Sequence, residues 1–141
     1  MSEAENKSIV EAIQASEKLT SGEIRIYIES KNPLKNSLER AKAVFFKQKM
    51  FQTAQRNGVL IYLSIKDREV AILGDEGIHK AVGDVFWNEQ IKTMLDLFKS
   101  QSVADGICSC VNAVGEVLKE KFPYQQGTDK NELSDEIIFG R

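Results

Sequence analysis

Residues 23–29, EIRIYIE, alternate between apolar and polar side chains. This alternation places the three isoleucines on one face and the charged residues and the tyrosine on the other, which predicts a strand covered by the core on one side. Residues 6–19 precede it and carry apolar side chains at helical spacing. The pattern stops at Thr20-Ser21-Gly22, where the glycine suits a left-handed cap, so residues 6–19 are predicted to form an amphipathic helix.

The middle of the chain predicts a long helix followed by a hairpin. Residues 34–55 contain neither glycine nor proline and place apolar side chains on one stripe, and Asn57-Gly58 is predicted to end this helix. Residues 59–65 form a continuous apolar run typical of a buried strand. The polar turn 66–68 then leads into a second strand at 69–73. Because a helix joins the first two strands they should be parallel, whereas the tight turn makes the third antiparallel to the second.

The last third of the chain is mostly helical in pattern. Residues 77–87 show short-range helical spacing with an interruption at Gly83-Asp84, and residues 88–99 continue it. Ser102 is predicted to cap a final helix, which ends at Phe122-Pro123. This order of elements predicts an α/β protein: a three-layer α/β/α sandwich with a small mixed sheet of about four strands flanked by helices.

The length of 141 residues predicts a single domain. We expect that domain to span residues 1–123. Residues 124–141 form a polar tail in which Ile137-Ile138-Phe139 is the apolar exception. This short run is predicted to add an edge strand or to dock on the core.

Charge and hydropathy exclude several classes of partner. The net charge is -2 and no basic run occurs, so nucleic acid is not expected as a partner. The N-terminal residues are acidic where a signal peptide is basic, and no apolar stretch approaches the ~18 residues that span a bilayer. We therefore expect a cytoplasmic monomer without membrane contact.

The cysteine and histidine content offers little material for thiolate or imidazole chemistry. Cys108 and Cys110 are two residues apart on a predicted helix, so their side chains point to nearly opposite faces and should stay reduced. His79 is the single histidine and is predicted to be exposed and structural. No catalytic residue is assigned.

Acidic residues are the remaining candidates for a site. In the predicted topology, the starts of the first two strands and the end of the third lie at the same edge of the sheet. Glu23 would then lie near the loop Gly74–Gly77, which contains Asp75 and Glu76. Carboxylates and backbone oxygens are the ligands of hard cations such as Ca²⁺. The alternative interpretation is a solvated turn, in which these residues bind nothing.

Two further acidic residues lie in the helical half of the chain. Asp105 follows Ser102 by three residues, which also fits a capping box. Asp84 follows Gly83 and would equally suit the N-cap of a helix. Both are kept as candidate oxygen ligands beside these structural interpretations.

Six segments spread over nearly the whole chain are informative together: RNGVLIYLSIKDREVAILGDEGI at 56–78, SGEIRIYIE at 21–29, LERAKAVF at 38–45, VFWNE at 85–89, VADGI at 103–107 and NELSDEI at 131–137. In their order and spacing they resemble the TPM domain family. The resemblance implies an α/β/α sandwich, in agreement with the predicted topology. It also implies binding of a divalent cation, calcium, and places the family's acidic positions at Asp75, Asp84 and Asp105; magnesium is the other ion that we expect such oxygen ligands to bind.

Three functions follow as hypotheses. The first is a stand-alone module that binds a divalent cation. The second is a metal-assisted acid phosphatase, which the resemblance implies for some members and in which Asp75 would assist a water. The third is a non-catalytic module whose protein partner contacts the tail or the polar face of strand 23–29.

Overall fold

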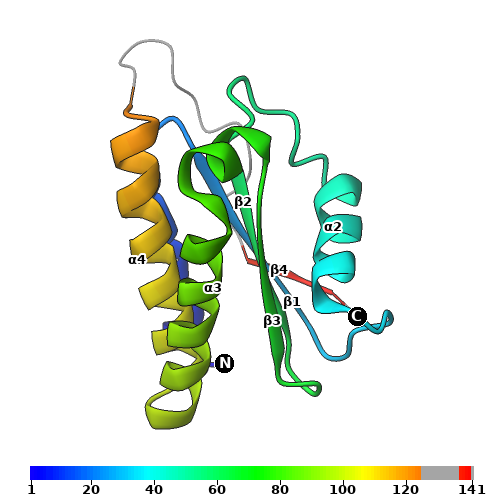
Figure 1. Ribbon diagram of the computed structural model, residues 1–141. Coiled ribbons are helices and arrows are strands. Elements are labelled where there is room, and N and C mark those ends of the chain that lie inside the picture. Colours follow the sequence, from blue (N-terminus) through cyan, green and yellow to red (C-terminus); the bar gives the residue numbers. More distant parts are fainter. Residues whose placement is uncertain (125–136, 141) are drawn as a thin grey trace.

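The computed structural model describes residues 1–124 and 137–140 (Figure 1). In chain order its elements are α1 (Glu3–Glu17), β1 (Glu23–Glu29), α2 (Ser37–Lys47), β2 (Gly58–Ser64), β3 (Glu69–Gly74), α3 (Glu76–Ser100), α4 (Val103–Lys121) and β4 (Ile137–Phe139).

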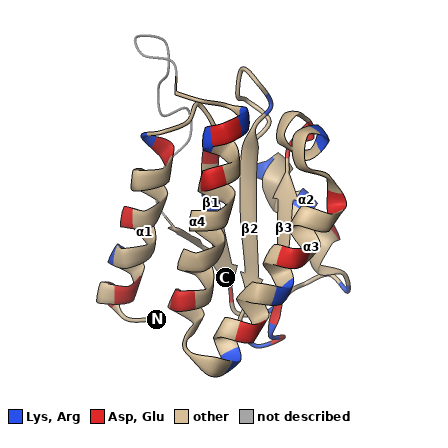
Figure 2. Ribbon diagram, turned by 60° about the vertical axis from the view of Figure 1, so that its left-hand side comes forward, with Lys and Arg blue, Asp and Glu red and all other residues tan. Residues whose placement is uncertain are grey.

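The four strands form one mixed sheet in the order β3-β2-β1-β4. β1 is parallel to both β2 and β4, and β3 is antiparallel to β2. The predicted directions of the first three strands are confirmed, and the apolar run of the tail forms an edge strand. One face of the sheet carries α1, α3 and α4, and the other carries α2 (Figures 1 and 2). The predicted three-layer sandwich is therefore the fold of the protein.

Two hydrophobic clusters lie on the two faces of the sheet. The isoleucines of β1 point into the larger cluster, with Ile9 and Ile13 of α1 and the apolar stripe of α4. Alternate side chains of β2 point to the smaller cluster, where Leu60 and Tyr62 pack against Phe45 of α2. Every residue of β2 is buried because the sheet is covered on both faces.

Helix α2 is shorter than the sequence pattern predicts. It begins after Asn36, whose side chain accepts a hydrogen bond from the backbone N–H of Glu39 (3.0 Å). It ends at Lys47 because Lys49 has a left-handed backbone (φ 55°). The N–H of Met50 donates to the carbonyl of Phe45 (3.1 Å), and the N–H of Lys49 donates to the carbonyl of Phe46. This is a Schellman motif with lysine in place of the usual glycine.

Helix α3 contains the interruption that the sequence predicts. Gly83 has φ 78° and ψ 174°, which breaks the helical path between the two halves of α3.

The two cysteines lie in α4. Cys108 is half-buried and Cys110 buried, and both thiols are free. No helix in residues 1–124 or 137–140 is long and apolar enough to cross a membrane.

Candidate cation site at the amino end of the sheet

Three segments meet where β1 and β2 begin and β3 ends, which we call the amino end of the sheet. The parallel register pairs Glu23 with Gly58. The N–H of Glu23 donates to the carbonyl of Asn57 (3.4 Å), and the N–H of Asp75 donates to the carbonyl of Gly58 (2.9 Å). The predicted convergence of these segments is confirmed.

Glu23 occupies the first position of β1 and is only 2% exposed. Because the isoleucines of β1 point to the larger cluster, Glu23 and Arg25 point to the opposite face. Burial lowers the pKa of Arg25, and the neighbouring carboxylates of Glu23 and Glu17 oppose that shift. Glu17 lies nearby because its Oε2 accepts a hydrogen bond from the N–H of Ile24 (2.8 Å). The start of β1 is therefore a buried charged cluster.

Asn57 lies at the same end and is 1% exposed. Its Nδ2 donates to Ser21 Oγ (3.3 Å), which also accepts from Gln55 Nε2 (3.0 Å). The backbone N–H of Asn57 donates to Thr53 Oγ1 (3.2 Å). Its side-chain oxygen Oδ1 is buried and has no hydrogen-bond partner among the described residues. This oxygen is available to a ligand in the site.

Asp75 and Glu76 are brought together by Arg56. Asp75 is buried at the N-cap of α3, and its two oxygens accept from Arg56 Nε (2.6 Å) and Nη2 (2.9 Å). Oδ1 of Asp75 also accepts from the N–H of Glu76 (2.8 Å). Arg56 Nη1 lies 3.4 Å from Glu76 Oε1. The hydrogen bonds that Arg56 donates to Asp75 raise the pKa of Arg56, so the guanidinium stays charged.

The loop geometry that permits this pairing requires a glycine. The N–H of Gly77 donates to the carbonyl of Arg56 (2.8 Å). A Cβ at Gly77 would lie 2.2 Å from the carbonyl oxygen of Gln55, closer than any side chain allows. The sequence GDEG therefore lets α3 start against the loop that carries Arg56.

The other two predicted ligands lie in different surroundings. The Asp84 side chain is 86% exposed, and its Oδ1 is 3.6 Å from His79 Nε2. Nδ1 of this histidine accepts a hydrogen bond from Trp87 Nε1 (3.0 Å). Asp105 is in the first turn of α4, and its N–H donates to Oγ of the N-cap Ser102 (3.0 Å). Within the described ranges, no three His, Cys, Asp or Glu side chains are grouped closely enough to hold a metal.

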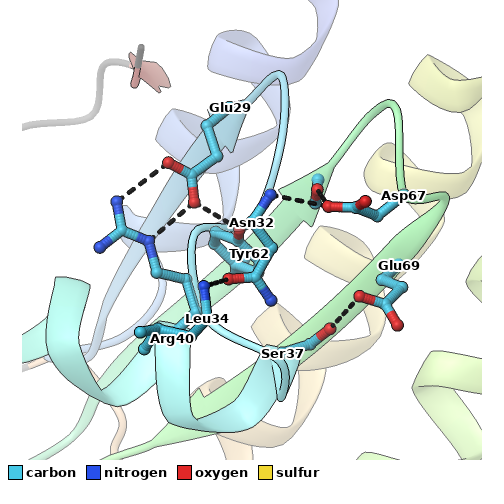
Figure 3. Close-up of polar contacts among 9 residues, drawn as sticks. Glu29, Asn32, Leu34, Ser37, Arg40, Tyr62, Asp67 and Glu69 are labelled. Carbon is cyan, nitrogen blue, oxygen red and sulfur yellow. Dashed lines mark hydrogen bonds and ion pairs between the residues drawn. The ribbon is translucent and has the colours of Figure 1, made fainter.

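A second polar cluster, which the sequence pattern did not reveal, lies at the opposite end of β1 (Figure 3). Glu29 is buried and accepts two hydrogen bonds from Arg40 (Nε, 2.7 Å; Nη2, 2.9 Å) and one from the hydroxyl of Tyr62. Burial would raise the pKa of Glu29, but the hydrogen bonds from Arg40 and Tyr62 outweigh it and lower the pKa. Burial and the bond to Glu29 raise the pKa of Tyr62. The cluster fastens α2 to the sheet.

Nearby, Asp67 links the β2–β3 turn to the loop that follows β1 through hydrogen bonds. Its Oδ2 accepts from Ser64 Oγ (2.6 Å) and from the N–H of Asn32 (2.7 Å). These hydrogen bonds lower the pKa of Asp67. The carboxylates of Glu29 and Asp67 are thus both engaged by donors of the chain itself.

Comparison with known proteins places the chain in a family. The TPM domain matches residues 1–117. The chain is similar to BA42 protein from the psychrophilic bacterium Bizionia argentinensis, whose structure was solved by NMR. The two sequences are 36% identical, the structures superpose with a TM-score of 0.90, and the match covers 99% of this chain and 95% of that one. No curated protein matches the chain.

A more distant solved structure shares the fold alone. It is the solution NMR structure of the N-terminal domain of cg2496 protein from Corynebacterium glutamicum. This domain is 13% identical with a TM-score of 0.61, and the match covers 84% of this chain and 74% of that one. From the domain match and the likeness to BA42 together, the chain belongs to the TPM domain family.

Proposed function

We propose that the protein binds a divalent cation, calcium or magnesium, at the amino end of the sheet through Glu23 and Asn57. One observation carries the proposal: Oδ1 of Asn57 is buried without a hydrogen-bond partner among the described residues, at the same sheet end as the buried carboxylate of Glu23. Buried polar oxygens in folded proteins nearly always have a partner. A cation bound between these groups would supply it.

The donor set suits a hard cation. Calcium and magnesium bind carboxylate, amide and backbone oxygens together with water. Glu23 supplies a carboxylate and Asn57 an amide oxygen.

Asp75 and Glu76, which the sequence favoured as ligands, support the proposal less strongly. A cation bound to Asp75 would have to displace the guanidinium of Arg56 and its two charge-assisted hydrogen bonds. Asp84 is a solvent-exposed neighbour of His79, and Asp105 belongs to the capped start of α4. We therefore place Glu23 in the site and the other four carboxylates outside it.

An NMR titration tests the site directly. The full chain, labelled with ¹⁵N, is titrated with calcium chloride and separately with magnesium chloride. We expect saturable shifts of the backbone amides of Ser21–Glu23 and Asn57–Gly58. Glu23→Gln should weaken binding about ten-fold or more, because it removes the charged ligand. Asp84→Asn, which removes an exposed carboxylate, should bind as the unaltered chain does.

Two outcomes would contradict this placement. Amides that stay still at millimolar calcium and magnesium would exclude cation binding. If Asp75→Asn abolished binding while Glu23→Gln did not, the site would lie at Asp75, one of the acidic positions that the family resemblance implies.

The other two hypotheses receive less support. Both oxygens of Asp75 accept hydrogen bonds from Arg56, so this carboxylate is poorly placed to take a proton from a water in a phosphatase reaction. Turnover of p-nitrophenyl phosphate that Asp75→Asn abolishes would revive that hypothesis. On the polar face of β1, Arg25 and Glu29 are buried, so a protein partner would find only Tyr27 partly exposed there. The tail contact proposed for residues 124–141 falls mostly outside the described residues.

A further inference from the structure

The structure contains an open sheet edge that the cation site does not use. β3 is the last strand of the sheet, and β2 is its only neighbour among the described strands. Figure 1 shows β3 at the border of the sheet, between α2 and α3. An edge strand presents unpaired backbone groups that can bind a further strand.

The hydrogen-bond pattern identifies which residues of β3 face outward. The N–H of Asp75 donates to the carbonyl of Gly58, the residue opposite it. In an antiparallel pair, hydrogen-bonded and non-bonded positions alternate. The backbone groups of Val70, Ile72 and Gly74 therefore point away from β2, toward the open edge.

This edge forms the floor of a groove with helical walls. One hollow of about 430 Å³ runs along β3 between Leu38 and Lys42 of α2 and Trp87 of α3. A second hollow of about 460 Å³ continues it past Lys42 toward Phe46. Leu38 and Phe46 are exposed apolar side chains on the α2 wall. The two hollows share Lys42, Leu73 and Gly74, so they adjoin at the end of β3, and we call them together the β3 groove.

The depth of the groove decides what can occupy it. Ile72 is only 4% exposed although its backbone faces the open edge. Leu38 and Lys42 of α2 line the hollow on one side and Trp87 of α3 lines it on the other, so the edge lies between two helices. In a second copy the same helices flank β3, so they would meet these walls before that strand reached the edge. A single extended peptide can enter, as in other cases of strand addition.

The two walls carry opposite charges. Lys42 is the charged residue on the α2 wall of the first hollow, whereas Glu76 and Asp84 lie on the α3 wall. Successive side chains of an extended peptide point to opposite faces. A peptide in the groove would therefore place alternate residues against a basic wall and an acidic wall.

We propose that the β3 groove binds an extended segment of a partner protein as a fifth strand, with an acidic residue facing Lys42 and an adjacent basic residue facing Glu76 and Asp84. Apolar residues on either side of this charged pair would contact Leu38 and Trp87. This binding is independent of the cation site.

Two synthetic peptides of equal composition test the proposal. Ac-Val-Lys-Glu-Leu-Val-Thr-NH₂ places its charges on opposite faces, and Ac-Val-Lys-Leu-Glu-Val-Thr-NH₂ places them on the same face. Each is titrated into the ¹⁵N-labelled full chain in chelator, so that the result does not depend on a cation. We expect the first peptide to shift the amides of Val70, Ile72 and Gly74 saturably and to slow their hydrogen exchange.

Protein and peptide variants make the result specific. Lys42→Glu should weaken binding of the first peptide about two- to five-fold, as expected for loss of an exposed ion pair. Lys35→Glu, which changes a charge outside the groove, should not. N-methylation of alternate residues of the peptide should abolish binding, because it removes the backbone donors.

Equal binding of the two peptides, or no shift of the β3 amides at millimolar peptide, would overturn the proposal. It would also be overturned if the β3 amides shifted with protein concentration in the absence of peptide, since a second copy would then occupy the groove.

Discussion

Single residues of this protein hold conformations or charges that local pattern does not explain. Lys49 adopts a left-handed backbone that glycine adopts at lower cost. Glu29 is buried as a carboxylate because Arg40 and Tyr62 donate to it. Each of these features predicts how a substitution would change the free energy of unfolding.

Lys49→Gly should stabilise the protein by about 0.5–1 kcal/mol. Glycine removes the strain of the left-handed backbone, and its larger loss of backbone entropy on folding offsets only part of this gain. Urea denaturation with an unchanged m-value would measure this. The control, Lys47→Gly, lies within α2 and should destabilise by roughly 1 kcal/mol. A Lys49→Gly variant no more stable than the unaltered chain would contradict the Schellman assignment.

The low pKa of Glu29 predicts an acid-dependent loss of stability. When the folded-state pKa lies below the unfolded value, the carboxylate stabilises the protein above the unfolded pKa of about 4.5. This contribution is lost as the pH falls below that value and through the folded pKa. The free energy of unfolding of Glu29→Gln should therefore fall less steeply with acid, as followed by urea titrations from pH 6 to pH 3. Parallel curves for the two proteins would exclude a role for Glu29.

At the scale of elements, breaks and caps determine where helices start and stop. Gly83 interrupts α3 with a backbone conformation that is essentially restricted to glycine. Ser102 starts α4 by accepting the N–H of Asp105. Neither feature depends on the cation site, so both can be tested separately from it.

Gly83→Ala should destabilise the protein by about 1–3 kcal/mol, although an added Cβ would meet no atom within 4 Å. The cost comes from the backbone alone, and thermal unfolding would measure it. Ala81→Gly, in the regular part of the same helix, is the control. It should destabilise the protein by about 1 kcal/mol, because alanine is a better helix former than glycine where the backbone is helical. If Gly83→Ala had no effect, the helix would be continuous through residue 83.

At the scale of the whole molecule, a cation that binds only the folded state should stabilise it. At about 100 times Kd the gain is ~2.7 kcal/mol. For a domain of this length, we expect calcium to raise Tm by roughly 5–10 °C relative to chelator. Glu23→Gln should remove most of this difference. Differential scanning calorimetry of both proteins in calcium and in chelator would measure it.

A cap variant provides the matched control for this experiment. Ser102→Ala should cost about 1 kcal/mol, and the loss should be the same with and without calcium. Coincident melting curves of the unaltered chain in calcium and in chelator would contradict the proposed site. If calcium were needed to see the effect of Asp105→Asn, Asp105 would be a ligand instead of part of the cap.

The sequence by itself determined the architecture of this protein. The spacing of apolar residues distinguishes helix from strand over a few residues. The length of the segment between two neighbouring strands decides whether they are parallel or antiparallel. The order of layers, the strand directions and the break at Gly83 all follow from such local information. The early end of α2 did not, because it depends on a hydrogen-bonded motif with Lys49 where a glycine would have signalled it.

Only the tertiary structure decided which acidic residues share an environment. Asp75 meets Arg56, which lies 19 positions away, and Glu29 meets Arg40, 11 positions away. Such pairings depend on how loops and helices approach one another in space. The spacing of apolar and polar residues along the chain does not predict these contacts between remote segments. The burial of Glu23 beside Asn57 and the position of the β3 edge between two helices arise in the same way, from packing between segments remote in sequence.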